Sequence, residues 1–510
     1  MLNDVFIKQE KANKYVSGYL KRINKIQDTL NFCLTEEHGS NLPFVRITKI
    51  ILTNFKSVGH GEIVFSSGKK FIPYGTESDI LGLYGQNGSG KTALINALEL
   101  LRGMLIGVPY KGYSKFFLGY VKADSDFATI YTEFDLQYRD GRVRKVSYEF
   151  SLMVDSIKKK TAKTVKKEKQ RVRFFNEKIS MGGDFCGKKQ ELQLIIDMTK
   201  QTNPFVSLAK QRGFLGENKG LNKVCKYMKS AFKNSCSFAF MNEVLDYYKE
   251  KGNYSEFYQV LLELKYFALR YFFVIGTQYS GLIRLNTGII LPTQEGDIYL
   301  RFSQPKSIIK EGLDWFKDYF KKINIVLMQL VPGIELKVKT HNEFKAIDGR
   351  DYVNVSLNIV KNGLEFPLKE ESDGTRRLIS IMSLFILAFN CSSCTIVIDE
   401  FDAGIFEYLL GEIFEIFQES GKGQLIFTSH NLRPLEVLDK KYIYFTTTDP
   451  QNRYTQLKHV GKNDNLRDAY FREIILNSDE FIFRKIKKNK IIQALYDATP
   501  EYIKKAENNG

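Results

Sequence analysis

The stretch that decides the fold is DILGLYGQNGSGKTALINALELL, residues 79–101. It starts as an apolar run typical of a buried strand, passes through a glycine-rich turn, and ends with apolar residues at helical spacing. The turn matches G-x-x-x-x-G-K-[ST], whose glycines let successive backbone amides point at phosphate oxygens. An incidental glycine-rich turn would not explain the Lys-Thr pair. We therefore predict a phosphate-binding loop made of Gly85, Gln86, Asn87, Gly88, Ser89, Gly90, Lys91 and Thr92.

Two side chains of this loop are expected to meet a nucleotide directly. Lys91 would contact its β and γ phosphates, and Thr92 would place its hydroxyl on Mg²⁺. The helix that follows presents its positive N-terminus to the same anion. ATP and Mg²⁺ are therefore the expected ligands of the site.

A second apolar strand, TIVIDE at residues 395–400, ends in two acids. A carboxylate at the end of a strand can hold Mg²⁺, which suits Asp399, and the adjacent Glu400 can polarise an attacking water. Two carboxylates in this place are costly unless a cation or a substrate uses them. The alternative is a plain surface turn. We predict Asp399 as a metal ligand and Glu400 as a catalytic residue.

The next strand, QLIFTSH, ends in His430. A histidine at this point can hydrogen-bond the γ phosphate and respond to its presence. Taken alone, such a residue is more often a capping or packing histidine. With the other elements in this order, His430 is predicted as a second catalytic residue.

A fourth element, EESDGTRR at residues 370–377, precedes a long apolar helix. Its residues Ser372, Gly374 and Thr375 bring hydroxyls and backbone amides to a helix N-terminus, where anions bind. The element has no lysine of its own, so the simplest hypothesis is that it binds the nucleotide held by another subunit. The alternative is a simple helix start with Ser372 or Asp373 as the N-cap.

Composition points to a protein of the reducing cytoplasm. The 75 Lys and Arg against 58 Asp and Glu give a net charge of +17, which favours a polyanion such as nucleic acid or reflects basic composition alone. The six cysteines are scattered, and the first residues lack the apolar core of a secretion signal. The apolar stretch 378–398 contains Asn390, so a buried helix and strand are expected there and no membrane contact.

The pattern along the chain predicts an α/β fold with a parallel nucleotide-binding sheet, an antiparallel β subdomain and a mostly helical insertion. Asp140 and Gly141 predict a hairpin in the antiparallel part. The basic segment 158–173 is either a finger that touches phosphates or a solvated hairpin tip. The expected segments are a helical extension (1–44), the first half of the head (45–180), the insertion (181–333), the second half of the head (334–460) and a helical tail (461–510).

In this order the four motifs resemble the ABC ATPase superclass, and within it the heads of RecF, SMC and OLD-type proteins. The opening Asn54-Phe55-Lys56-Ser57, the signature at 372–377, IDEFDAGI and FTSHNLRPLEVL are similar to AAA-type ATPases of anti-phage systems such as PARIS, Septu and abortive-infection modules. The resemblance implies an ABC-type head with Lys56 near the nucleotide. It also implies that Ser372 and Gly374 engage the γ phosphate across a dimer, and that Asp402 links the two sites.

One departure from the family pattern concerns the metal. Residues 101–136 contain no Gln, although many such heads carry a metal-contacting one in this region, and Gln137 is a weak substitute.

Two functions follow from the resemblance. The first is a cytoplasmic defence ATPase that forms at least a dimer, senses nucleic acid or a phage-derived trigger, and controls a separately encoded effector. OLD-type proteins append a Toprim nuclease module, for which the 80 residues after His430 are too few. The alternative is a RecF- or SMC-like ATPase that clamps DNA. A transporter subunit is disfavoured because the large insertion and the RecF-like opening do not suit a transporter head.

Overall fold

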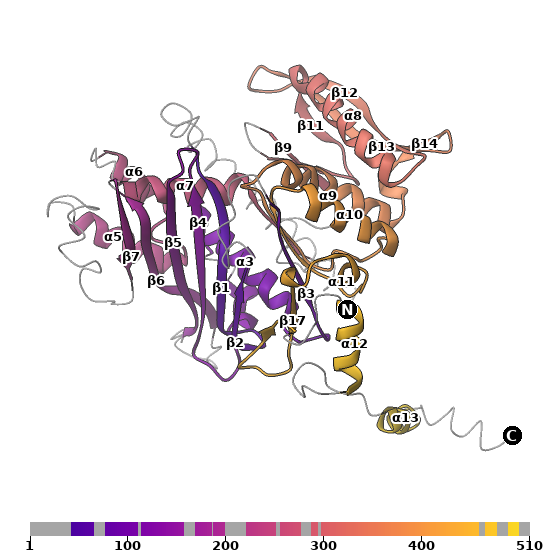
Figure 1. The fold of residues 1–510 in the computed structure, drawn as a ribbon. Helices are drawn as coiled ribbons and strands as arrows, with labels where there is room; N and C mark the ends of the chain where they lie inside the picture. Colours follow the sequence, from indigo (N-terminus) through magenta and orange to yellow (C-terminus); the bar gives the residue numbers. More distant parts are fainter. Residues whose placement is uncertain are drawn as a thin grey trace, which may run out of the picture.

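The centre of the structure is a mainly parallel sheet in the strand order β18-β17-β3-β16-β15-β8 (Figure 1). Its strands read as continuous apolar runs because both faces of the sheet are covered. They are β3 (Asp79–Tyr84), β8 (Phe272–Ile275), β15 (Thr395–Ile398), β16 (Gln424–Thr428), β17 (Ile443–Thr446) and β18 (Tyr454–Thr455), of which β18 runs antiparallel to β17. The phosphate loop follows β3, so it opens at the carboxyl edge of this sheet.

A second, antiparallel sheet stands beside it in the order β2-β1-β4-β5-β6-β7. It is made of β1 (Phe44–Phe55), β2 (Val58–Val64), β4 (Phe127–Gln137), β5 (Val143–Ile157), β6 (Lys169–Phe185) and β7 (Lys188–Asp197). The predicted hairpin at Asp140 and Gly141 joins β4 to β5, with Gln137 opposite Val143. Gly141 takes the positive φ of 88° that this turn requires.

The structure is a computed structural model that describes residues 42–65, 77–110, 114–157, 169–185, 187–198, 221–250, 256–276, 287–293, 297–457, 465–476 and 488–498. The predicted N-terminal helix lies outside these residues, and so does most of the basic segment, 158–168. The expected segment boundaries therefore stay predictions.

Helix α3 (Lys91–Ile106) lies between the two sheets and is buried over nearly its whole length. It contacts β1 on one side and β8 and β15 on the other. Apolar residues lie on all faces of α3, as expected for a helix that is enclosed on every side. Because Lys91 is its first residue, the phosphate loop is fixed to the core of the protein.

The predicted insertion contains helices and also strands. Its helices are α5 (Leu221–Asn234), α6 (Asn242–Glu250), α7 (Glu256–Arg270) and α8 (Leu313–Leu330), and a small pair of strands is formed by β9 (Gly288–Pro292) and β10 (Asp297–Arg301). Strand β8 immediately follows α7 and becomes the edge of the parallel sheet. The α/β class, with parallel and antiparallel sheets and a helical part, is confirmed.

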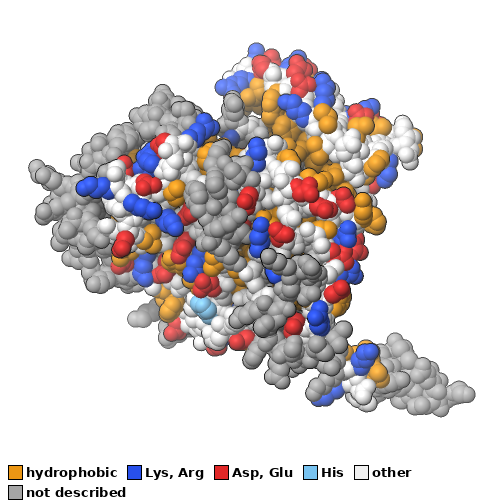
Figure 2. Space-filling model, viewed as in Figure 1, with side chains coloured by type: hydrophobic (Ala, Val, Ile, Leu, Met, Phe, Trp, Pro, Cys, Tyr) orange, Lys and Arg blue, Asp and Glu red, His pale blue; other side chains and the backbone are white. Residues whose placement is uncertain are grey.

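A small lobe stands apart from the body in Figure 1. Helix α8 packs on a sheet of β11 (Lys306–Ile309), β12 (Ile334–Lys345), β13 (Asp351–Lys361) and β14 (Leu364–Pro367). Asn324 of α8 holds β12 with two bonds of 2.8 Å, to the Leu336 amide and carbonyl. Figure 2 shows hydrophobic side chains gathered where this lobe meets the body.

After the lobe, the chain returns through α9 (Asp373–Asn390) to β15. These two elements account for the apolar stretch 378–398, which is a buried helix and a buried strand as predicted. In the part of the chain that the structure describes, no helix combines the length and the hydropathy that a membrane crossing needs. The remaining helices are α10 (Glu407–Ser420), α11 (Pro434–Val437), α12 (Leu466–Leu476) and α13 (Lys488–Asp497).

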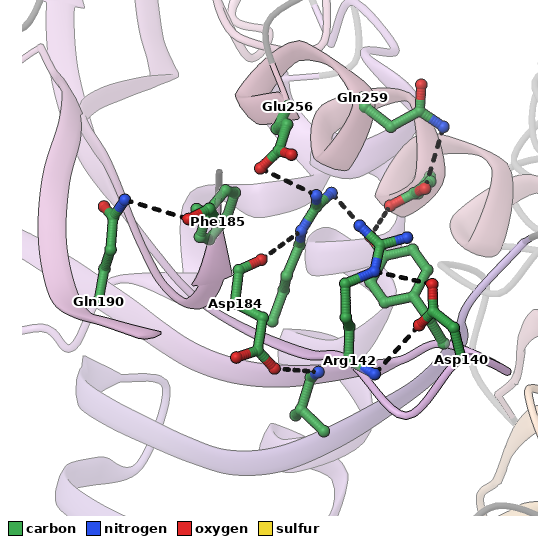
Figure 3. A network of polar contacts seen from close by, with 11 residues as sticks. Asp140, Arg142, Asp184, Phe185, Gln190, Glu256 and Gln259 are labelled. Atoms are coloured by element: carbon green, nitrogen blue, oxygen red, sulfur yellow. Dashed lines mark hydrogen bonds and ion pairs between the residues drawn. The ribbon is translucent and has the colours of Figure 1, made fainter. Parts of the chain in front are cut away.

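A polar network ties the β4–β5 hairpin to α7. Arg144 of β5 pairs with Glu256 of α7 at 3.1 Å, and Gln259 of α7 donates to Glu263 at 3.0 Å. Figure 3 shows this network together with the hairpin residues Asp140 and Arg142. Nearby, Tyr138 donates to Glu263 at 2.5 Å, and burial raises the pKa of Glu263 to about 7. Buried polar groups in such a network need their partners, so these bonds hold α7 against the antiparallel sheet.

Gln424 joins the two sheets. Its side chain accepts from the Ile47 amide of β1 at 3.3 Å and donates to the Ile47 carbonyl at 2.8 Å and to Asp79 at 2.9 Å. Thr395 of β15 also donates to it at 3.2 Å. Gln424 is fully buried, so these four bonds are shielded from water and hold β1, β3 and β15 to β16.

Gln424→Leu should therefore lower the free energy of unfolding by about 2–4 kcal/mol, since it leaves several buried polar groups unpaired. Thermal and urea unfolding would measure the change. Gln304→Leu, at an exposed position in a turn, serves as the control and should leave stability nearly unchanged. Equal stability of the two variants would show that the sheets do not depend on this side chain.

Candidate nucleotide site

The phosphate loop has the backbone conformation that its glycines predict. Gly85, Gly88 and Gly90 have φ values of 145°, 77° and 104°, all in the region that favours glycine. A Cβ on Gly85 would lie 1.8 Å from the Thr446 hydroxyl, so this position cannot carry a side chain. Around Gly88 there is open space and its surface is exposed, which leaves room for a ligand over the loop.

Ser89 and Asn87 complete the loop in different ways. Ser89 is buried, donates to the Gln86 carbonyl at 2.5 Å and contacts the Thr446 hydroxyl, so it holds the loop in shape. Asn87 is exposed at the tip. Tyr454 donates to the Gly90 carbonyl at 3.1 Å from the edge of the parallel sheet. The loop is thus anchored by β17 and β18, which motif reasoning did not include.

Lys91 carries a largely desolvated amine. Its Nζ donates to the carbonyls of Gly85 at 2.6 Å and Gln86 at 3.0 Å, so it lies across the loop. Burial lowers its pKa, while the nearby carboxylates of Asp399, Glu400 and Asp402 act in the opposite direction. The structure therefore brings the lysine of the loop and the acids of the distant strand 395–398 into one site. Thr92, the next residue, is half-buried in the first turn of α3.

Thr428 connects the two predicted acids. Its hydroxyl donates to Asp399 Oδ1 at 2.7 Å and accepts from the Glu400 amide at 2.8 Å. Glu400 has a φ of 49°, an unusual conformation for a residue with a side chain and one that is found at functional sites. Asp399 is buried and Glu400 half-buried, so the strand end places one acid in the interior and the other at the opening.

Arg377 holds the same turn from the other side. It donates to the Asp399 carbonyl at 3.1 Å and also bonds the Glu400 carbonyl. Burial lowers its pKa, and the neighbouring carboxylates Glu400, Asp402 and Asp399 partly offset this. Because Arg377 belongs to α9, it connects the signature segment to the turn that carries Glu400.

The signature residues begin α9 as predicted. Ser372 is the N-cap: its hydroxyl accepts from the Thr375 amide at 3.3 Å and donates to the Thr375 hydroxyl at 2.9 Å. Ser372 itself is exposed. A Cβ on Gly374 would lie 2.0 Å from the Gly404 carbonyl, so the start of α9 packs backbone to backbone on the loop that follows Glu400. Gly374 thus has a packing role within its own subunit.

Asp402 holds the segment that carries His430. Its Oδ2 accepts from the amides of His430 at 3.1 Å and Asn431 at 2.9 Å. The His430 side chain is exposed at the end of β16, on the same sheet edge as Asp399. Its predicted role on the γ phosphate stays a prediction.

Lys56 lies at the site as the resemblance implied. Its Nζ bonds Asn96 of α3 and stands 4.9 Å from the centre of the Tyr120 ring. Burial lowers its pKa, with Asp399 as the largest opposing influence. Lys56 therefore adds a second cation beside the buried acid.

Gln137 is not at the site. It pairs with Phe44 at the start of β1, whereas Lys56 follows the end of that strand, roughly 35 Å away at the rise of an extended chain. Gln137 is therefore placed as a weak substitute for a metal-contacting Gln, because β4 runs antiparallel to β1 and carries Gln137 to the far end.

Several neighbours of the site had no signal in the sequence. The motif QLIFTSH contains Thr428, but nothing in the motif indicates a role for this residue. Arg377 belongs to the signature segment, and its sequence position does not show that it contacts the Glu400 turn. The others are Asn96, Tyr120, Thr446 and Tyr454, which are ordinary helix, loop and strand residues until the fold brings them to the loop.

The residues present fit a nucleotide with its metal. The loop offers backbone amides, open space over Gly88 and the amine of Lys91, which are the groups that phosphates take. The hydroxyl of Thr92 and the carboxylate of Asp399 are oxygen donors of the kind that Mg²⁺ prefers. Among the described residues, no group of three or more His, Cys, Asp or Glu side chains could hold a metal by itself.

Comparison with known proteins gives two sequence matches. Residues 49–269 match a family model described as an AAA domain, and residues 294–436 match one described as "AAA domain, putative AbiEii toxin, Type IV TA system". No curated protein matches the chain. Each family match covers less than half of the chain, and the two together include all four motifs.

Solved structures give remote likenesses. The SMC head domain from Thermotoga maritima has 14% identity over 81% of this chain and 99% of its own, with a TM-score of 0.31. The Smc head from Pyrococcus furiosus, bound to the C-terminal domain of ScpA, has 13% identity over 85% and 99%, with 0.37. The recombination mediator RecF with ATP has 13% over 81% and 100%, with 0.32. These structural similarities are too weak to support an assignment. The two sequence matches and the geometry of the site support an AAA-type, ATP-binding ATPase.

Lys91→Ala should weaken ATP binding at least about 30-fold, because it removes the cation that faces the phosphates in a desolvated site. Calorimetric titration with ATP would measure the loss. Lys422→Ala, at an exposed turn, is the matched control and should bind as the natural protein does. Normal ATP affinity in Lys91→Ala would contradict the assignment of the loop.

Gly374→Ala should slow ATP turnover without an equal loss of ATP affinity. The added Cβ displaces Gly404 and the loop that holds Asp402, while the phosphate loop is untouched. Steady-state phosphate release and ATP titration would separate the two effects. Gly119→Ala, where a Cβ meets nothing within 4 Å, is the control. Unchanged turnover in Gly374→Ala would show that the contact with Gly404 is dispensable.

Proposed function

We propose that this protein hydrolyses ATP at the loop 85–92 and uses the cycle to switch between assembly states. The observation that carries this proposal is the parallel pairing of β3 and β15 with β16. It brings Asp399, Glu400 and Asp402, which come from a strand end some 300 residues away in sequence, to the same sheet edge as Lys91. A buried cation beside acids at the mouth of a phosphate loop suits phosphoryl transfer to water. The alternative is that these charged residues only stabilise the fold. That alternative does not explain the open space over Gly88 in the phosphate loop.

Each residue then has a task. The loop amides and Lys91 bind the phosphates, and Lys56 adds positive charge beside Asp399. Thr92 and Asp399 are the residues that would hold Mg²⁺, which neutralises charge on the β and γ phosphates when bound. Glu400 orients the attacking water and accepts its proton, while Thr428 and Arg377 fix the turn on which Glu400 stands. His430 contacts the γ phosphate from the neighbouring strand.

The pocket is completed by a second copy of the chain. Ser372 is the N-cap of α9 and is exposed, so the N-terminus of this helix, where an anion could bind, is at the protein surface. Gly404, which packs on Gly374, is followed by Phe406 and Tyr408, whose side chains are 73% and 60% exposed. Exposed aromatic side chains beside a helix N-terminus support an interface between subunits. ATP held between two heads would close a dimer, and hydrolysis would release it.

The biological role that fits best is a sensor and regulator in anti-phage defence. In this role the cytoplasmic homo-oligomer responds to nucleic acid or a phage-derived trigger and controls a separately encoded effector, a nuclease or another toxin. The support is the match of residues 294–436 to a domain whose description names a toxin–antitoxin system, together with the motif resemblance. The alternative, a DNA clamp of the RecF or SMC kind, is favoured by the charge of +17.

Glu400→Gln should bind ATP normally, lose hydrolysis by at least about 100-fold, and accumulate as an ATP-dependent dimer or larger assembly, because only the proton acceptor is removed. Phosphate release and light scattering after size exclusion would measure both effects. Glu415→Gln, an exposed acid on α10, is the control. Undiminished turnover would show that Glu400 is not the water-orienting residue.

The same trapped assembly separates the two roles. Co-purification of the product of a neighbouring gene, with no DNA affinity at moderate salt, would support the regulator. Tight binding of duplex DNA that falls steeply with salt, without a protein partner, would support the clamp.

A further inference from the structure

A second cavity lies far from the phosphate loop, where the small lobe meets the body. Its volume is about 920 Å³, which is within the range of small-molecule sites. The lobe contributes residues of β11, α8 and β13, and the body contributes the end of α7, β9 and Leu387 of α9. Figure 2 shows hydrophobic side chains along this junction.

One wall of the cavity is aromatic. Trp315 and Tyr319 stand one turn apart on α8 with ring centres 5.4 Å apart, and Trp315 is 44% exposed. Tyr271 follows α7 on the body side, and Tyr352 of β13 lies on the lobe side. Large flat side chains that stay exposed are platforms on which a planar ring can stack.

The other feature of the cavity is positive charge. Arg270 and Lys306 line it, and none of its described lining residues is an acid. Arg270 Nη2 bonds the Thr293 carbonyl, whereas its Nη1 is buried without a hydrogen-bond partner. Asp297, which is outside the lining, is near enough for Arg270 to lower its pKa, although burial is the larger effect and raises that pKa to about 6. Lys306 is exposed and makes no ion pair with a described residue.

We propose that this cavity binds a free nucleotide other than the ATP of the phosphate loop. The base would stack on Trp315, and the phosphate would lie between the charges of Arg270 and Lys306. An apolar peptide would cover the aromatic wall but would offer no anion to these two cations. A nucleotide satisfies both halves of the cavity with one molecule.

A ligand in this cavity would contact the helix that begins at the signature segment. Leu387 lines the cavity on α9, and the same helix begins at Ser372 and Gly374. A ligand that bridges lobe and body would favour one placement of α9 over another. This consequence rests on the proposed ATPase function, whereas binding itself does not.

The test uses Lys91→Ala, in which the phosphate loop is disabled. AMP, GMP, CMP and UMP are titrated separately, followed by calorimetry and by the fluorescence of Trp315, the only tryptophan of the chain. We expect at least one of them to bind saturably and to change the Trp315 emission. Ribose 5-phosphate and inorganic phosphate should bind at least about 10-fold more weakly, because they lack the base.

Two variants in the same background locate the site. Arg270→Met and Trp315→Leu should each weaken nucleotide binding about 10-fold or more by calorimetry, and Arg350→Met, outside the cavity on the β12–β13 turn, should leave it unchanged. Trp315→Leu keeps the test valid if Arg270→Met does not fold. The proposal is overturned if no nucleotide binds Lys91→Ala, if inorganic phosphate binds equally well, or if Trp315→Leu binds as tightly as its parent.

Discussion

The structure depends on one electrostatic constraint, the burial of the Lys91 amine beside the carboxylates of the β15 strand end. Burial lowers the pKa of the amine, and the acids oppose that effect. A desolvated amine that shares a sheet edge with acids is costly unless hydrogen bonds or a ligand use its charge, and Lys91 Nζ is bonded to the carbonyls of Gly85 and Gln86. The buried α3 and the parallel sheet hold this set together, because each element carries one member to the same edge.

Around this centre, the contacts form a continuous chain. Thr428 connects Asp399 to Glu400, Arg377 connects their carbonyls to α9, and Gly374 packs on the loop of Asp402. Asp402 in turn holds the backbone of His430. A displacement of α9 would therefore be felt at Glu400 and at His430 within the same subunit. These contacts would let the proposed binding of a ligand at the small lobe influence the proposed hydrolysis of ATP.

Sequence reasoning succeeded where the signal is local. The strand, loop and helix around Gly85, the acids after β15, and the Asp140-Gly141 hairpin each depend on neighbouring residues only, and the structure has them. It could not place Gln137, because motif order along the chain does not show that β4 runs away from the site. Tyr120 and Thr446 reach the loop only through tertiary packing, and β8 depends on a partner strand far along the chain. No pattern within a segment could show these contacts.

The central claim is that one subunit supplies the phosphate loop and a second supplies the signature. Hydrogen exchange with ATP and Mg²⁺, at protein concentrations below and above dimer formation, tests it most directly. Because the Ser372 and Thr375 amides are already bonded within one subunit, the readout is the protection that ATP adds to the nucleotide-free protein. We predict that ATP adds protection at residues 85–92 at both concentrations and at residues 372–375 only when the dimer forms. No added protection at 85–92, or ATP-dependent protection of 372–375 in the monomer, would contradict this account.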